Sequence, residues 1–577
     1  MLEETLYRFD QVVKSRRLGG RHYDWVEWDL LRHNAETYGS REAYCDFFHG
    51  WNAPRRRTWA GAYEDVNRFI FHALDHGLGP GARVVSQLPS CVESVYLDWA
   101  TSKLGASHAA LNVDLGERET LGALGKVRPD LAVVIGEWHG RPFADWYREA
   151  RKMLPGLTVL VVTRPGEEAP PGIESFDAWL TDDIWERYAM EDLAWLKTDP
   201  LRVHEMLPTS GTTGVPKLSR RTTVDWFHVH SVCIAERAGH TVYDARLLIG
   251  PLAGGSGRLW GVHTPLYTGG RTVILTEFDE EAAFDITERE RITLWTWNPA
   301  LITRLVTSDA FNHRDLSTLR QVSYSGAPLP ADVIARLAER GVVAFNVYGT
   351  SEVGGCMSPI LPGISERHLL DAAGVPFEGF DVPVVDAAGE RVGPGEVGEI
   401  LIWNIHHGYV DSPEETAATY HDDTYGGRWE GYQHTGDLGV YDDAGYLRVV
   451  GRKKDMILRG GQNIFPKEVE DVLSAHPAVR DVALVGMPDP VLGERVCAFV
   501  VPQEGVALRL SDVTAYLDGL GLAKFKWPER LEVVDALPMG PGGKVVKVEL
   551  RDRIRATLEA ENAREARGNR RDGGGSV

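Results

Sequence analysis

Residues 209–217, Thr-Ser-Gly-Thr-Thr-Gly-Val-Pro-Lys, combine small hydroxyls, two glycines and a closing lysine. Glycine lets backbone N–H groups approach an anion closely, hydroxyls donate further hydrogen bonds, and lysine supplies a compact positive charge. This composition is typical of a phosphate-binding loop, with a solvated surface loop as the alternative. The P-loop of nucleotide triphosphatases requires Gly-Lys-Ser/Thr after its spacer. Because Val215 and Pro216 intervene and no Ser or Thr follows Lys217, these residues do not form a P-loop.

Two segments further along the chain carry groups suited to a nucleotide. Residues 323–329 place Gly326 after an apolar run, where the backbone can meet a flat ring. Residues 346–352 offer an amide, an aromatic face, a hydroxyl and a carboxylate. A purine needs the first two of these groups, and a metal-bound phosphate needs the last two. Taken singly, Tyr348 could equally pack in a core, and Glu352 could be a solvated carboxylate.

Three segments nearer the C-terminus complete the set. Asp437 follows a tight turn, where its carboxylate could accept both hydroxyls of a ribose. Residues 451–470 join charged side chains to the pair Gly460 and Gly461, and residues 537–544 present Lys544 on a glycine-rich loop. A solvated turn carboxylate and a surface lysine are the ordinary alternatives for Asp437 and Lys544.

Hydrophobic patterns predict the elements that position these segments. Short apolar runs rich in β-branched residues predict buried strands at 83–88, 131–135, 157–162 and 271–275. Residues 91–104 show one apolar helical face, and Gly105 is a plausible stop. Strands that alternate with helices predict an α/β protein with largely parallel sheets.

The pattern changes from residue 398 onward. Shorter strands separated by Gly and Asp turns, as at 441–450, predict an antiparallel, β-rich subdomain. Beyond residue 454, the pattern predicts a small α+β domain with helices near 466–474 and 511–517 and strands near 482–485 and 496–501. Residues 560–577 are low in apolar content, and we expect a disordered tail there.

Composition limits the classes of partner. The 62 Lys and Arg residues against 83 Asp and Glu residues give a formal charge of −21, which repels nucleic acid and anionic lipid surfaces. The five scattered cysteines show no C-x-x-C spacing, so neither a disulfide framework nor a zinc site is indicated. No apolar run approaches the ~20 residues that span a bilayer. We therefore expect a cytoplasmic protein that has neither nucleic acid nor membrane as a partner.

The order and spacing of these segments resemble the signature motifs of the adenylate-forming superfamily. This superfamily contains acyl-CoA synthetases, aryl acid AMP ligases, peptide-synthetase adenylation domains and luciferases. The resemblance implies a large N-terminal domain, residues 1–451, made of two doubly wound α/β subdomains and a small β-rich subdomain. It also implies a small, mobile α+β C-terminal domain, residues 452–559, followed by the tail.

The resemblance further implies a two-step reaction. A carboxylate attacks the α-phosphate of ATP to give an acyl adenylate and pyrophosphate, and a thiol then displaces AMP. Because two anions must meet, the phosphates need cationic and dipolar stabilisation. The residues implied for ATP are Thr209, Ser210, Gly211, Thr212, Thr213, Gly214 and Lys217 at the phosphates, Gly326, Ala327, Asn346, Tyr348 and Gly349 around adenine, and Asp437 and Arg452 at the ribose.

Five further roles follow from the same resemblance. Glu352 would help to hold Mg²⁺, and Ser351, where the family usually has threonine, would keep a hydroxyl for the α-phosphate. Lys544 matches the lysine that bridges the attacking carboxylate and the α-phosphate, and Lys454 matches the hinge on which the C-terminal domain rotates. Gly460 and Gly461 would leave a narrow path for the pantetheine arm of coenzyme A or a carrier protein.

The acid is the least determined part of the reaction. Residues 217–222 look closer to aryl acid ligases than to fatty acyl-CoA synthetases, which favours an aromatic or cyclic acid. The pocket segment, residues 250–260, lacks the asparagine of dihydroxybenzoate ligases and the aspartate of amino-acid adenylation domains. Its glycines would leave room for a longer acid such as a cinnamate or a substituted benzoate, with loop flexibility as the alternative. The pocket residues implied are Gly254, Gly255, Ser256, Trp260, Ser325 and Gly349.

These observations support a ranked set of hypotheses. The first is a ligase that makes an aryl or cyclic acyl-CoA from a small-molecule acid. The second is a stand-alone adenylation enzyme that loads an acyl carrier protein. The third is an atypical member that activates another anion, such as nitrite for diazotising an aryl amine. A non-catalytic nucleotide-binding regulator is disfavoured because Lys544 and Glu352 are both present. We expect a monomer or a homodimer.

Overall fold

The computed structural model describes residues 25–572 except 182, 185–187, 189–192, 194, 210–215, 360–363, 378–379, 404–406, 421–423 and 540–544. The predicted phosphate-loop residues 210–214 and the predicted adenylation lysine, Lys544, therefore lie outside the described residues. The chain forms two compact units. One takes the described residues up to Val382 together with Ile402–Gln433, and the other takes Pro383–Leu401 together with the described residues from His434 onward.

The first unit contains two mainly parallel sheets, as the sequence predicts. In the first sheet only the last pair of strands, β8 and β9, is antiparallel among the described pairings. Its strands lie in the order β7 (Glu174–Ser175), β6 (Thr158–Val162), β5 (Leu131–Ile135), β3 (Arg83–Gln87), β4 (Ser107–Ala110), β8 (Val203–Thr209) and β9 (Lys217–Thr222).

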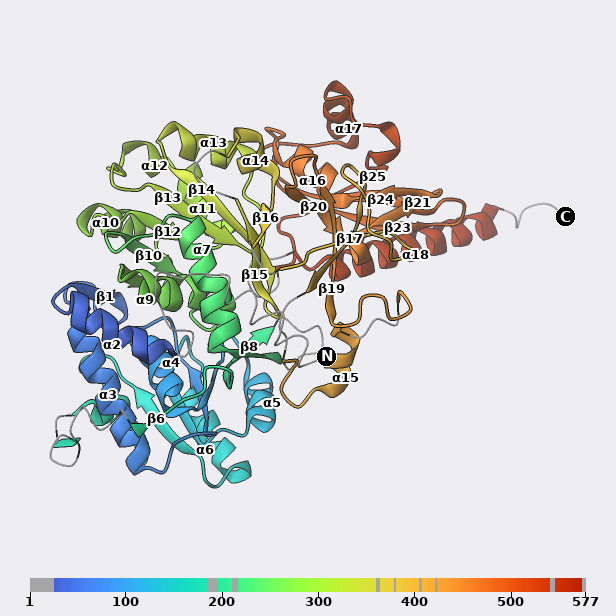
Figure 1. Ribbon diagram of the computed structural model, residues 1–577. Coiled ribbons are helices and arrows are strands. Elements are labelled where there is room, and N and C mark those ends of the chain that lie inside the picture. The colour runs from blue at the N-terminus through green and yellow to red at the C-terminus, as the bar shows by residue number, and fades with distance from the viewer. Residues whose placement is uncertain are drawn as a thin grey trace. The chain divides into compact units, whose positions relative to one another are not determined.

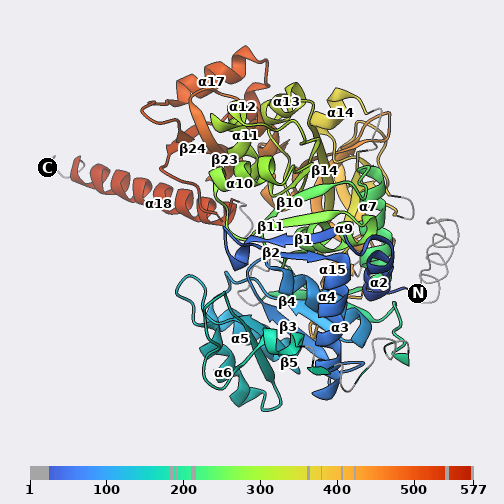
Figure 2. The same cartoon turned by 90° about the vertical axis from the view of Figure 1, so that its left-hand side faces the viewer.

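Helices cover both faces of this sheet. Apolar side chains of α5 (Glu117–Val127) and α6 (Phe143–Met153) form one core with the strands. Helix α4 (Val92–Leu104) contacts β3 and β4 and packs with α2 (Glu27–Tyr38) and α3 (Trp59–Asp75) (Figures 1 and 2). This arrangement is the doubly wound type implied by the resemblance.

The second sheet repeats the same architecture. Its strands lie in the order β16 (Val375–Pro376), β15 (Gly354–Ser358), β14 (Val343–Thr350), β13 (Gln321–Ser325), β12 (Leu294–Thr296), β10 (Ala245–Ile249), β11 (Arg271–Leu275), β1 (Glu42–Asp46) and β2 (Arg55–Thr58). Helices α10 (Glu280–Arg289), α11 (Pro299–Thr307) and α13 (Ala331–Glu339) bury their apolar faces on it.

The remaining helical segments of the first unit are short. They are η1 (Phe47–His49), η2 (Phe176–Leu180), η5 (Thr223–Ser231), α7 (Val232–Arg237), α8 (Gly255–Arg258), η6 (Leu259–His263), α9 (Thr264–Thr268), α12 (Ala310–His313), α14 (Glu366–Asp371) and α15 (Pro413–Tyr420).

The second unit is α+β. One sheet has the order β17 (Val384–Val385), β18 (Gly398–Trp403), β19 (Tyr432–Tyr441) and β20 (Leu447–Arg452). The other has the order β22 (Gln462–Ile464), β21 (Ile457–Arg459), β24 (Gly493–Pro502) and β23 (Val479–Asp489), and β25 (Arg530–Val533) pairs with β24. The helical segments are η7 (Lys453–Asp455), α16 (Pro466–Ser474), α17 (Leu510–Gly519), η8 (Lys524–Lys526) and α18 (Lys547–Asp572).

Three features differ from the sequence-based expectations. All thirteen residues of α4 are buried, so the helix is enclosed on every side rather than on one face. The compact units do not divide at residue 451, because α16 contacts β20 and the β19–β20 hairpin groups with the C-terminal residues. Helix α18 continues to Asp572, where we expected a tail from 560 without regular structure, because this segment is rich in the helix formers Ala, Glu and Arg.

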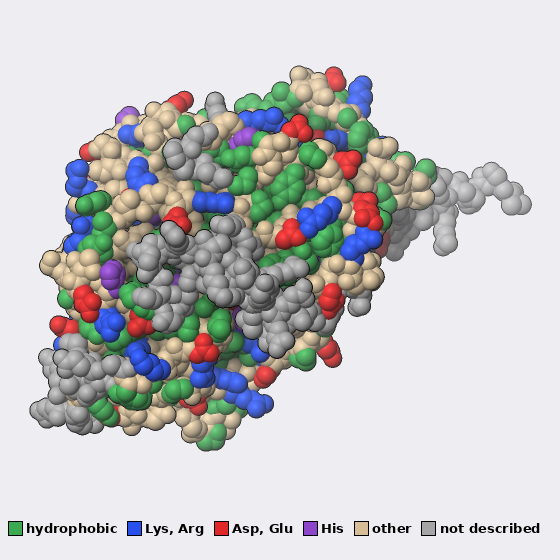
Figure 3. All heavy atoms as spheres, in the orientation of Figure 1, with side chains coloured by type: hydrophobic (Ala, Val, Ile, Leu, Met, Phe, Trp, Pro, Cys, Tyr) green, Lys and Arg blue, Asp and Glu red, His purple; other side chains and the backbone are tan. Residues whose placement is uncertain are grey.

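The surface and the helices carry two further observations. Acidic and basic side chains are interspersed on the face shown in Figure 3, although the chain carries a formal charge of −21. Within the described part of the chain, no helix combines the length and the apolar character needed to cross a membrane.

Candidate active site

The ends of β8 and β9 anchor the predicted phosphate loop. These strands are antiparallel, with Thr209 opposite Lys217 in the register, so the intervening segment begins and ends at one place. The ammonium of Lys217 lies 5.4 Å from the ring centroid of Tyr409. An aromatic face attracts a lysine ammonium, so this contact restricts the position of the Lys217 side chain.

Tyr409 also connects this lysine to Glu352. Its hydroxyl donates to Oε1 of Glu352 at 2.7 Å, and Nε2 of Gln433 lies 3.4 Å from Oε2. Burial and the Glu352 carboxylate raise the pKa of Tyr409, so the phenol remains a donor at neutral pH. The structure therefore brings Lys217, the predicted phosphate lysine, and Glu352, the predicted metal ligand, to the same tyrosine. The sequence reasoning assigned no role to Tyr409.

The donor set around Glu352 is compatible with magnesium. Mg²⁺ is usually bound through one or two carboxylates together with substrate phosphates and water. Glu352 is half-buried and supplies one such carboxylate, and Tyr409 and Gln433 orient it. Ser351 is also half-buried and lies in the turn between β14 and β15.

The predicted adenine segments lie at the carboxyl ends of adjacent parallel strands. Strands β13 and β14 pair with Tyr324 opposite Asn346, so Gly326 and Ala327 leave the sheet beside the end of β14. Gly326 is exposed and has φ +90°, a conformation that favours glycine. Ligands of open α/β sheets bind at this edge.

Gly349 has a local structural role. A Cβ at Gly349 would lie 1.9 Å from the carbonyl oxygen of Gly354, so the β14–β15 hairpin requires glycine at this position. Tyr348 precedes it and is half-buried on β14.

Asp437 and Arg452 belong to the second unit and face each other across the β19–β20 hairpin. Arg452 Nε lies 2.9 Å from Asp437 Oδ1, and the Asp437 N–H donates to Thr435 Oγ1 at 3.0 Å. The structure confirms that these two residues lie together, and their contact with a ribose stays a prediction.

The hinge and thiol-path residues also lie in the second unit. Lys454 is in η7, directly after β20. Gly460 and Gly461 form a two-residue turn between β21 and β22, with φ values of +54° and +84°. Positive φ at both central residues is the requirement of a type I′ hairpin turn, so this turn by itself accounts for both glycines.

The predicted acid pocket is only partly as expected. Ser256 Oγ lies 2.9 Å from Ser325 Oγ, so two of the predicted pocket residues meet. Gly254 caps α8, and Trp260 is buried with its ring centroid 5.8 Å from that of His240. A Cβ at Gly257 would lie 2.1 Å from the Pro251 carbonyl oxygen, so the space expected beside Gly257 is filled by the chain's own turn.

Sequence reasoning missed three residues, Arg221 in β9 and Trp226 and His230 in the following segment η5. Arg221 is fully buried and donates to the carbonyl oxygens of Glu352 and, at 3.2 Å, Val353. Its guanidinium lies 4.9 Å from the ring centroid of Trp226, and Nδ1 of His230 lies 2.6 Å from the Gly355 carbonyl oxygen. For Trp226 and His230 a sequence signal was available, because residues 223–231 are rich in aromatic and imidazole side chains. The structure shows that this run has π-helical geometry, which is frequent at functional sites.

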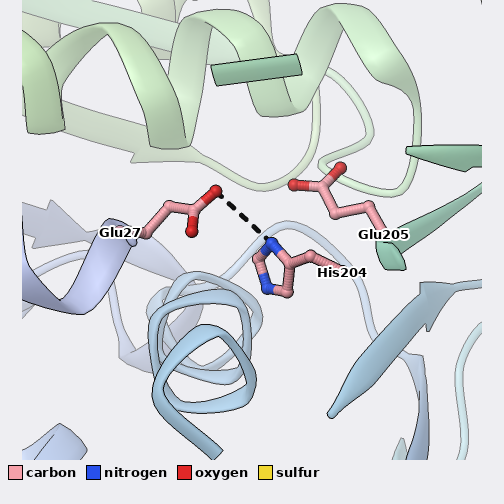
Figure 4. A group of neighbouring side chains, drawn as sticks. All are labelled: Glu27, His204 and Glu205. Carbon is pink, nitrogen blue, oxygen red and sulfur yellow. Dashed lines mark ion pairs between the residues drawn. The ribbon is translucent and has the colours of Figure 1, made fainter. Parts of the chain in front are cut away.

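A buried charge network lies on the strand that leads to the phosphate loop. Figure 4 shows Glu27, from α2, facing His204, from β8, at 3.3 Å between Oε1 and Nδ1. Burial alone would raise the pKa of Glu27, but the charge and hydrogen bond of His204 hold it at about 2. Burial by itself would lower the pKa of His204. The charge and hydrogen bond of Glu27 outweigh burial, so the pKa of His204 is raised above its usual value.

Glu205 is the third member of this group. The ligand atoms of Glu27, His204 and Glu205 lie within 4.8 Å of one another. Glu205 already contacts His263 at 3.0 Å and Arg258 at 3.7 Å, and Thr223 donates to Glu27 at 2.9 Å. These partners neutralise the carboxylates, so we interpret the group as a structural charge network rather than a metal site.

Taken together, the fold and these contacts define a class of protein. Two doubly wound α/β sheets, a small-residue loop closed by a lysine, and a carboxylate that shares a tyrosine with that lysine are the features of an α/β nucleotide-binding enzyme.

Comparison with known proteins identifies the family. The model of the AMP-binding enzyme family matches residues 31–408, and that of the AMP-binding enzyme C-terminal domain matches residues 468–544. The medium-chain fatty-acid–CoA ligase of Escherichia coli (strain K12) is 30% identical over 85% of this chain and 86% of its own. The 2,3-dihydroxybenzoate-AMP ligase of Bacillus subtilis (strain 168) is 31% identical over 96% of this chain and 98% of its own.

A solved structure agrees with these relatives. The crystal structure of ATP-bound MatB from Rhodopseudomonas palustris superimposes with a TM-score of 0.77 at 26% identity, covering 91% of this chain and 98% of that one. The chain belongs to the AMP-binding enzyme family, within the adenylate-forming superfamily of acyl-CoA synthetases and aryl acid AMP ligases. It is an ATP-binding, AMP-forming acid–thiol ligase.

Proposed function

We propose that this enzyme activates an aromatic or cyclic carboxylic acid as an acyl adenylate and then forms its thioester with coenzyme A. The observation that carries the first step is the contact chain Lys217–Tyr409–Glu352. It places a cation and a carboxylate on the same tyrosine at the base of the phosphate loop. A pyrophosphate leaving group requires the cation, and a magnesium ion requires the carboxylate.

The site residues take the following roles in this proposal. Lys217 and the loop from Thr209 to Gly214 hold the β- and γ-phosphates, and Glu352 holds Mg²⁺, which supplies further positive charge to the phosphates when bound. Gly326, Ala327, Asn346, Tyr348 and Gly349 frame adenine, Ser351 donates to the α-phosphate, and Asp437 with Arg452 binds the ribose. Lys544 bridges the acid and the α-phosphate, and residues 452–559 then turn about Lys454 to present the Gly460–Gly461 turn to the thiol.

The aromatic or cyclic acid is supported by two observations. One relative that aligns along nearly the whole chain bears the name of an aryl acid ligase. The contact between Ser256 and Ser325 brings two hydroxyls together, and the neighbouring Gly255 lies against the Trp226 ring, a composition that suits a ring with a polar substituent.

Two alternatives share the adenylation step. The enzyme could pass the acyl group to a carrier protein instead of free coenzyme A, or it could activate nitrite in the presence of an aryl amine. Release of pyrophosphate and AMP, measured with benzoates, cinnamates and cyclohexane carboxylates, separates these functions. The acids are supplied alone, with coenzyme A, with carrier protein, and with nitrite plus an amino-aryl acid.

Turnover that requires coenzyme A is the expected result. Turnover that requires carrier protein would mean that the acyl acceptor is a carrier protein and not coenzyme A. The proposed adenylation step would stand. Dependence on nitrite would overturn the proposal, as would a lack of pyrophosphate release with every acid.

A further inference from the structure

Two glycines of the pocket segment, Gly255 and Gly257, make room for the protein itself rather than for a ligand. A Cβ at Gly255 would lie 3.2 Å from Cη2 of Trp226. At Gly257 it would lie 2.1 Å from the Pro251 carbonyl oxygen. The space is open at the other two, since the nearest atom to a Cβ at Gly254 lies at 3.9 Å and a Cβ at Gly250 would meet no atom within 4 Å. The space beside Gly255 is therefore filled by an indole from another element, η5, and the space beside Gly257 by the backbone of the segment itself.

A second glycine meets the same indole from a distant part of the chain. Gly354, at the start of β15, has φ +78°, and a Cβ there would lie 2.6 Å from Cζ3 of Trp226. Gly354 in turn fills the space next to Gly349. The benzo edge of Trp226 thus contacts both the pocket segment at Gly255 and the hairpin that carries Glu352.

The indole is held in place on its other sides. Trp226 is 4% exposed, and the Arg221 guanidinium lies over its ring at 4.9 Å from the centroid. Arg221 is itself fixed by the carbonyl oxygens of Glu352 and Val353. The His263 ring packs edge-on against the indole at 6.1 Å. Rotation of Trp226 would break these contacts, so the ring acts as a fixed wall.

We propose that Trp226 is the specificity-determining residue of the acid site and restricts the enzyme to compact acids of about one ring. This inference rests on the proposed function, because it assumes that the Gly254–Ser256 segment binds the acid. It reverses the expectation that the glycines admit longer acids. Size exclusion by a rigid, close-packed wall discriminates strongly, since even a single methylene in a hydrophobic pocket changes kcat/KM by roughly 10- to 200-fold.

The test compares two acids that differ by one ring. Pyrophosphate release is measured with benzoate and with biphenyl-4-carboxylate for the wild type, Trp226→Phe and Trp226→Ala. We expect the wild type to favour benzoate by roughly 100-fold in kcat/KM, since a clash with a whole ring exceeds that of one methylene. Trp226→Ala should shift this ratio toward the biphenyl acid by at least about 10-fold, while KM for ATP stays within about two-fold.

Trp59→Phe is the matched control for Trp226→Phe, because Trp59 is fully buried in α3 and packs against Trp99. It should leave the acid preference unchanged. If Trp226→Ala does not fold, Trp226→Leu removes the ring with less loss of apolar volume and should shift the ratio in the same direction.

The two proposals fail in distinguishable ways. If none of the carboxylic acids makes the wild type release pyrophosphate, the proposed function is wrong. A wild type that adenylates aryl acids, but whose preference is unchanged in a folded Trp226→Ala or Trp226→Leu variant, would defeat only the role of Trp226. A wild-type preference for the biphenyl acid would also defeat it.

Discussion

At the scale of single residues, Tyr409 is the least expected part of the candidate site. It connects a cation and a carboxylate that lie 135 positions apart in the chain, Lys217 and Glu352, by accepting the first on its ring face and donating its hydroxyl to the second. The two halves of this contact can be separated chemically, because phenylalanine retains the ring and loses the hydroxyl.

We therefore predict that Tyr409→Phe slows adenylate formation by roughly 10-fold, the equivalent of one hydrogen bond to a charged group. The Mg²⁺ concentration needed for half-maximal rate should rise, because Glu352 loses the donor that orients it. Pyrophosphate release titrated with Mg²⁺ measures both effects. Tyr432→Phe, which removes a hydroxyl bonded to Asp381 at 2.7 Å, should change neither.

A second prediction at this scale concerns Lys544. Lys544→Ala should reduce adenylate formation by roughly 10²- to 10³-fold, since it removes a cation aimed at the charge that develops at the α-phosphate. Conversion of a supplied acyl adenylate to the thioester should be unaffected. The two half-reactions are measured separately, and loss of both in a folded variant would contradict the role assigned to this lysine.

At the scale of elements, the β21–β22 hairpin shows how one sequence feature can serve two purposes. The pair Gly460 and Gly461 satisfies a type I′ turn, and a Cβ at Gly461 would meet no atom within 4 Å. The turn explains why glycine is needed, and the open space beside Gly461 is compatible with a passing pantetheine arm.

A pair of variants distinguishes the turn from the path. Gly461→Ala and Gly505→Ala both place alanine at positive φ in the second unit with open space around it, and each should cost roughly 1–2 kcal/mol of stability. Only Gly461→Ala should slow thioester formation from a supplied adenylate, by about 10-fold or more. If both variants form the thioester at the same rate, Gly460 and Gly461 are needed only for the type I′ turn and not for a pantetheine path.

At the scale of the whole molecule, stability depends on charges that are sequestered from water. Glu27, His204 and Glu205 join α2 to β8 inside the first unit. Breaking a buried pair leaves an uncompensated charge, which is far more costly than losing a surface pair. The network therefore makes stability depend on pH in a defined window.

The sign of this dependence follows from the two pKa shifts. The pKa of Glu27 falls from 4.5 to about 2 on folding, so its contribution is present above pH 4.5 and is lost as pH falls toward 2. The pKa of His204 is raised above 6.5, so its contribution is present below pH 6.5 and is lost as pH rises through the folded pKa. The pair stabilises the fold most between these limits.

We predict that His204→Gln destabilises the first unit by about 3 kcal/mol between pH 4.5 and 6.5, and by less on either side. Urea unfolding followed by tryptophan fluorescence across pH 3–9 measures the difference. His313→Gln, at an exposed histidine, serves as the control. A difference that does not vary with pH would show that packing, and not charge, accounts for the effect.

Local patterns were sufficient to predict many elements. The strands at 131–135 and 271–275 and the helix at 466–474 have the predicted bounds, because short β-branched runs and a proline at the first helical turn are local signals. Helix α4 ends at Leu104 as predicted and begins at Val92, one residue after the predicted start, with Gly105 in the left-handed conformation after it. Its complete burial could not be predicted, since its carboxylates Glu93 and Asp98 are paired with distant arginines, Arg55 and Arg258.

The sequence by itself determined the family and the reaction class, because the residues that handle phosphates lie in short contiguous segments whose order is visible along the chain. Tertiary structure alone showed that Tyr409 joins Lys217 to Glu352 and that Trp226 occupies the space beside Gly255 and Gly354. The physical reason is that loop composition depends on near neighbours, whereas the shape of a binding site depends on which side chains from separate elements fill the same volume.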